Sequence, residues 1–130
     1  MLKNTSYYTK ILEINEQERY LGTYLDLLSL ERGVKEGLTY FKQRIGCSTQ
    51  ACSLTFKSEF DEFDLTFSEN VKLGSDQVIL EFGTPYPEEV YMYIDFEIFY
   101  DYLETWIKKQ YGNNSELLIL LKEVKATLEI

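Results

Sequence analysis

The chain has no histidine among its 130 residues. This absence removes every Ser–His or Cys–His nucleophile arrangement, and with it the commonest general base. The seven glycines also fall into no phosphate-binding or dinucleotide-binding fingerprint. The sequence therefore disfavours most hydrolase mechanisms and nucleotide chemistry. We expect a protein that is not an enzyme and that uses no cofactor.

Cysteine and long apolar runs are scarce as well. Only Cys47 and Cys52 occur, too few for a disulfide framework and only half of the ligands that a structural zinc ion needs. No apolar run approaches the roughly twenty residues that span a bilayer, and the first residues lack the apolar stretch of a signal peptide. These absences predict free thiols, no metal site, no membrane segment and a cytoplasmic location.

Positive charge is the third deficit, because 13 Lys and Arg stand against 22 Asp and Glu, for a net charge of −9. Residues 51–100 hold eleven of the acids against only Lys57 and Lys72, while the rest of the chain nearly balances. A content of 45% hydrophobic and 15% aromatic residues excludes a disordered acidic tail. A local excess of one sign attracts the other, so this segment predicts a docking face for something basic and disfavours nucleic acid as a partner.

The length suits a single domain, 1–130. Apolar residues recur at helical spacing from Phe96 to Tyr111, with Asp95 placed as an N-cap and Gly112 as a stop. A second helix follows, with an apolar stripe from Leu117 to Leu128 and Asn114 or Ser115 as its cap. The two predict an αα-hairpin.

The amino-terminal half also has helical spacing. Asn15 and Glu18 resemble a capping box, and the apolar residues that follow predict a helix over about residues 16–31. Three further apolar residues at helical spacing predict one more short helix: Leu38, Phe41 and Ile45.

The acidic segment has the pattern of β-strands. Residues 54–56, 63–67, 78–82 and 89–94 alternate or run apolar over short lengths, and the turn residues at 83–87 predict a hairpin over 77–94. The fold class that follows is α+β, with a small antiparallel sheet packed against amino-terminal helices and a carboxy-terminal αα-hairpin.

Strand alternation then assigns the two faces of the sheet. The inward set is apolar: Phe63, Leu65, Phe67, Val78, Leu80, Phe82, Val90, Met92 and Ile94. The opposite face and its flanking turns carry the predicted partner-binding residues: Glu59, Asp61, Glu62, Asp64, Glu69, Glu81, Glu89, Tyr91 and Tyr93. Exposed tyrosine among carboxylates is typical of interfaces, although a solvated sheet face gives the same pattern.

The sequence EVYMYIDFEIFYDYL at residues 89–103, followed by Tyr111 and a leucine-rich final helix, resembles the immunity proteins of bacterial contact-dependent growth inhibition systems. The similarity is to the branch paired with ribonuclease toxins. In that family a strand runs directly into a helix through a segment of the type Ser-Tyr-Glu-Glu-Phe-Tyr-x-Tyr-Leu, after an amino-terminal helix and short strands.

The resemblance implies a protein that binds a cognate toxin, commonly a nuclease with a basic RNA-binding cleft, as a monomer in a 1:1 complex. An acidic face suits that target, because a nuclease cleft attracts phosphate with Lys and Arg. Two other classes stay open. One is an acidic nucleic-acid mimic that inhibits a DNA-binding enzyme, and the other is a small intracellular ligand-binding or enzyme domain with a polar cleft.

Overall fold

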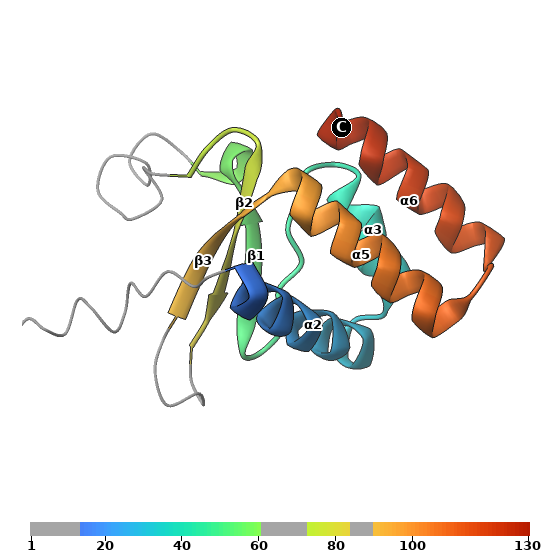
Figure 1. Ribbon diagram of the computed structural model, residues 1–130, viewed down its shortest axis with the longest axis horizontal. Helices are drawn as coiled ribbons and strands as arrows, with labels where there is room; N and C mark the ends of the chain where they lie inside the picture. Colours follow the sequence, from blue (N-terminus) through green and yellow to red (C-terminus); the bar gives the residue numbers. More distant parts are fainter. Residues whose placement is uncertain (1–13, 61–72, 84–89) are drawn as a thin grey trace, which may run out of the picture.

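The computed structural model describes residues 14–60, 73–83 and 90–130 (Figure 1). In these residues the elements occur in the order α2 (Ile14–Glu31), α3 (Val34–Phe41), β1 (Cys52–Phe56), the 3-10 turn η1 (Lys57–Glu59), β2 (Gln77–Phe82), β3 (Val90–Asp95), α5 (Phe96–Tyr111) and α6 (Ser115–Leu128). The predicted α+β class is confirmed, as are the antiparallel sheet and the carboxy-terminal helix pair.

The described sheet has the strand order β1-β2-β3 and is antiparallel throughout. Its register aligns Leu54 with Leu80 and Met92, and Phe56 with Val78 and Ile94. The side chains of these aligned residues are no more than 1% exposed, so the inner face is the one that alternation predicts. Figure 1 shows all the labelled helices on one side of the sheet.

Aromatic rings join the helices to the sheet. Phe99 of α5 lies 5.4 Å from Phe41 of α3 and 6.4 Å from Phe56 of β1, measured between ring centroids and with edge-on geometry in both pairs. All three rings are buried. Edge-to-face ring pairs of this kind stabilise a fold beyond the burial of their apolar area. These three rings therefore help to hold α3, β1 and α5 together at the centre of the core.

The helix pair begins and ends largely as its sequence predicts. Asn114 caps α6, since its side chain accepts a hydrogen bond from Leu117 N–H at 3.1 Å, and Gly112 ends α5 with a φ of 65°. Asp95 lies at the N-cap position of α5, but its carboxylate accepts from Gln77 Nε2 at 2.9 Å instead of capping the helix.

The amino-terminal helices differ from prediction in detail. Asn15 lies within α2, which begins at Ile14, so the capping-box interpretation is wrong. The helix α3 begins and ends earlier than its apolar spacing suggested, and Ile45 follows it. The predicted strand at 63–67, with its inward residues Phe63, Leu65 and Phe67, lies outside the described residues, as do most of the 83–87 turn and the side chain of Val90.

The segment between α3 and β1 returns alongside β1. Thr49 N–H donates to the Cys52 carbonyl at 2.8 Å, and the Gly46 backbone lies directly against the Leu54 carbonyl. A Cβ added at Gly46 would be 1.5 Å from that oxygen, so only glycine fits at this position.

Candidate partner-binding surface

The predicted surface on the outer face of the sheet is only partly described. Its described members are Glu59, Glu81, Tyr91 and Tyr93. The other five, which are Asp61, Glu62, Asp64, Glu69 and Glu89, lie outside the described residues. We call the outer face around Glu81 and Tyr93 the sheet surface.

Tyr91 is the member for which the expected exposure is wrong. Its side chain is 5% exposed and belongs to a second apolar cluster with Leu73 and Ile79, against which Phe60 also packs. These residues cover part of the outer face, so that face is not wholly open to solvent. The signal for this was Ile79: alternation places it outward, and a large apolar residue there indicates that something covers it.

Tyr93 and Glu81 remain accessible. Tyr93 is partly buried, and its ring meets that of Tyr91 edge-on at 5.4 Å between centroids. Glu81 is exposed and lies between Ser53 and Tyr91 in the strand register. The sheet surface therefore offers one exposed carboxylate and one partly buried ring in the described part of the chain.

The Glu59 side chain is bound to the backbone near η1. Its Oε2 accepts hydrogen bonds from the Phe56 N–H at 2.7 Å and the Gly46 N–H at 2.9 Å. These bonds close the η1 turn and hold the segment before β1 in place. A carboxylate already engaged with two backbone donors is a weaker docking group than a free one, because a partner must compete with those bonds.

A larger set of acidic side chains lies along the outward side of α5 and at its amino end. We call it the α5 surface, and it consists of Asp76, Asp95, Glu97, Asp101 and Glu104. The sequence analysis assigned none of these to binding. The helical spacing of Glu97, Asp101 and Glu104 opposite the apolar stripe was the signal that marked them as neighbours.

Three hollows adjoin the α5 surface. The first, of about 500 Å³, lies between the turn before β2, the start of α5 and the end of α6, and its lining includes Asp76, Asp95 and Glu97. A second of about 260 Å³ shares Glu97 with it. A third of about 320 Å³ shares Asp101 with the second and lies toward Glu18 of α2. The hollows therefore follow the exposed side of α5 on both flanks.

Two tyrosines respond to this charge. Burial raises the pKa of the Tyr100 hydroxyl, and the carboxylates of Glu104 and Asp101 raise it further. Burial likewise raises the pKa of Tyr102, with Asp26 and Glu18 adding to the effect. In both cases burial is the larger cause and neighbouring negative charge the smaller one, since each disfavours the phenolate.

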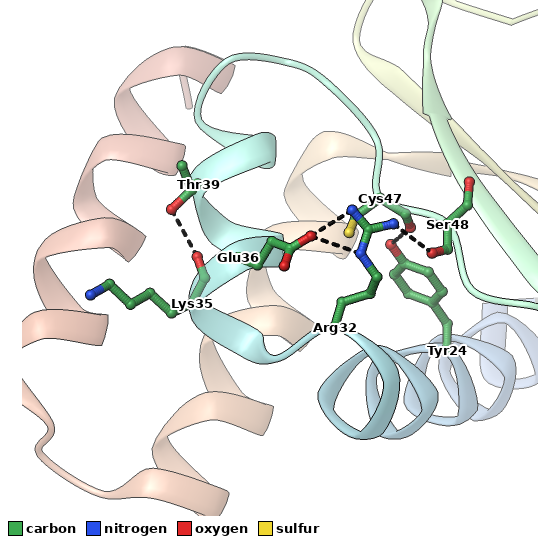
Figure 2. Close-up of polar contacts among 7 residues, drawn as sticks. All are labelled: Tyr24, Arg32, Lys35, Glu36, Thr39, Cys47 and Ser48. Atoms are coloured by element: carbon green, nitrogen blue, oxygen red, sulfur yellow. Dashed lines mark hydrogen bonds and ion pairs between the residues drawn. The ribbon is translucent and has the colours of Figure 1, made fainter.

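A polar cluster outside these surfaces joins α2, α3 and the segment before β1 (Figure 2). Arg32 Nε and Nη2 lie 2.7 and 2.5 Å from Glu36 Oε2, and Arg32 Nη1 lies 3.4 Å from the Ser48 carbonyl. The buried Tyr24 hydroxyl donates to the Cys47 carbonyl. These bonds hold the segment before β1 against α2 and α3.

The two cysteines are free thiols, as predicted, and both are buried. Burial raises the pKa of each thiol, although Arg32 partly offsets this at Cys47 and the Thr49 hydroxyl does so at Cys52. A buried, protonated thiol is a poor nucleophile. Among the described residues, no group of three or more Cys, Asp or Glu side chains is arranged to hold a metal ion.

Comparison with family models, with curated proteins and with solved structures gave no match for this chain. None of the helices in residues 14–60, 73–83 and 90–130 is long and apolar enough to cross a membrane.

Proposed function

We propose that this protein binds and neutralises a cognate bacterial toxin domain, a nuclease of the ribonuclease type, by covering its basic active-site cleft with an acidic surface. The observation that carries the proposal is the excess of carboxylates around α5. The three hollows are lined by seven Asp or Glu side chains against two cations, Arg44 and Lys125.

Such a surface suits a nuclease cleft on electrostatic grounds. A cleft that attracts phosphates presents Lys and Arg, and a carboxylate-rich protein enters the same field, which raises the association rate. Once bound, the carboxylate-rich protein excludes RNA, because the two would occupy the same cleft. A half-buried aromatic ring beside the acids, such as that of Tyr102, would slow dissociation by burying apolar area.

The order of elements also supports the proposal. β3 ends at Asp95 and α5 begins at Phe96, so the strand runs into the helix without a loop. Two helices, α2 and α3, and two strands, β1 and β2, precede this unit in the described residues, and a leucine-rich helix follows it. Apart from the second helix, α3, this is the order that the sequence resemblance implies for an immunity protein.

The test is protection of RNA. A panel of purified basic ribonuclease domains, including any that is encoded beside this chain, is mixed with the protein, and binding and RNA cleavage are measured. We expect a 1:1 complex and loss of cleavage for one member only. Inhibition of every member alike would favour a nucleic-acid mimic instead, and no binding or protection with any member would reject the proposal.

A further inference from the structure

Surface acids on α6 and on α5 differ in their ion pairing. On the side of α6 that faces α3, Glu116 lies 2.7 Å from Lys35 and Glu123 lies 3.0 Å from Lys42. On α5, Glu97 and Asp101 form no ion pair within residues 14–60, 73–83 and 90–130. The fold thus balances charge between α3 and α6, whereas on α5 Glu104 pairs with Lys108 at 3.3 Å and Glu97 and Asp101 have no ion pair in the described residues.

The two cations that line the hollows make their contacts with groups other than the acids of the α5 surface. The Arg44 guanidinium donates to the Thr127 carbonyl at 3.1 and 2.8 Å, and it lies over the Phe96 ring at 5.3 Å. The Lys125 ammonium lies over the Tyr100 ring at 5.9 Å. Arg44 Nη2 also lies 3.8 Å from Glu129, but neither cation pairs with Asp76, Asp95, Glu97 or Asp101, so no ion pair in the described residues neutralises these four carboxylates.

The shape of the same region is the second observation. The hollow of about 500 Å³ at the amino end of α5 shares Glu97 with the second hollow, and the hollow toward α2 shares Asp101 with the second. Ile98 and Tyr102 add partly exposed apolar area to the third hollow. Long side chains from a partner have room on both flanks of the helix, and they would meet carboxylates there.

We infer that the outward side of α5, with the hollow at its amino end, is the surface that meets the basic cleft of the partner, and that the sheet surface lies outside the main contact. This inference rests on the proposed function and specifies where it acts. The occupant is a folded protein surface rich in Lys and Arg, whose long side chains enter the hollows beside Glu97 and Asp101. The choice over the sheet surface follows from the burial of Tyr91 beneath Leu73 and Phe60.

The experiment compares three variants that remove surface charge without reversing it. Glu97→Gln/Asp101→Asn alters the α5 surface. Glu116→Gln/Glu123→Gln removes the same number of negative charges from α6. Glu81→Gln alters the sheet surface. The association rate with the ribonuclease domain that the wild-type protein inhibits is measured over a series of salt concentrations, together with thermal unfolding of each variant.

We expect the α5 variant to associate about tenfold more slowly at low ionic strength, with the difference shrinking as salt screens the field. The two control variants should associate within about twofold of wild type, and the α5 variant should unfold at or above the wild-type temperature, because its acids repel one another. An α5 variant with the wild-type rate overturns the inference, whether or not Glu81→Gln is slow, and leaves the proposed function standing. Failure of the wild type to bind any member of the panel rejects both.

Discussion

The Tyr24 hydroxyl allows a test that separates one buried hydrogen bond from the rest of the fold. Tyr24 lies in α2 with no exposed side-chain area, and its hydroxyl donates to the Cys47 carbonyl in the segment before β1. The described structure gives that carbonyl no other donor. Replacing Tyr24 by Phe keeps the ring and its packing but leaves the carbonyl buried without a partner.

The expected loss follows from that burial. A buried polar group left unsatisfied costs about 1–3 kcal/mol, so Tyr24→Phe should lower the free energy of unfolding by about that amount at pH 8. The matched control is Tyr40→Phe. Tyr40 is only partly buried, and its hydroxyl forms no hydrogen bond among the described residues, so the change should be within about 0.5 kcal/mol.

The pH dependence provides a second measurement. Burial raises the pKa of Tyr24 well above its ordinary value, and the nearby thiols of Cys47 and Cys52 add to this. A group whose pKa is raised in the fold stabilises it below the unfolded pKa, and that stability is lost as the pH rises toward the folded pKa. Between pH 8 and pH 11 the wild type should therefore lose about 1.4 kcal/mol that the Tyr24→Phe variant does not lose.

Urea unfolding of both proteins at pH 8 and at pH 11 measures these quantities. The difference in stability between them should be about 1–3 kcal/mol at pH 8 and should shrink or vanish at pH 11. Equal stability at pH 8, or a gap that stays constant with pH, would refute the reasoning. Either result would mean that the hydroxyl is not a buried donor.

Three further predictions concern positions that the packing restricts. Gly46→Ala should lower the free energy of unfolding by about 3 kcal/mol or more, or prevent folding, because the added Cβ would overlap a strand carbonyl. Gly83 has open space around it, so Gly83→Ala should change the free energy of unfolding in urea by less than about 1 kcal/mol. The thiols of Cys47 and Cys52 should react slowly with a disulfide reagent in the native protein at pH 8 and rapidly in urea, and fast native reaction would contradict their burial. Asn114→Ala should cost about 1 kcal/mol by removing the α6 cap, whereas Asn114→Asp should restore most of it.

The helix pair was readable from sequence because its signals are local. The apolar stripe of α5, Gly112 with its positive φ and the capping Asn114 each act within a few residues of chain, and each lies where predicted. The strand pair β2 and β3 was readable for the same reason, since alternation depends only on neighbours along the chain. The prediction that Asn15 and Glu18 form a capping box was wrong, because this short pattern also occurs inside helices.

The surface was less predictable because exposure is not a local property. Alternation correctly placed Tyr91 on the outer face of β3, but it says nothing about what lies above that face, where Leu73 and Phe60 pack. Likewise, Glu59 looked like a free surface acid until the fold brought the Gly46 N–H beside it.

The sequence by itself determined the order of the described elements, the inner face of β2 and β3, and the excess of negative charge in residues 51–100. These depend on composition and on short-range periodicity. Only the tertiary structure decided which acids share a surface. Asp76 lies in the middle of the acidic segment and Asp101 lies beyond its end, yet the packing of α5 between α2 and α6 brings both to hollows along one helix (Figure 1). The reason is physical: charge adds up over space, and distance along the chain does not measure distance in the folded protein.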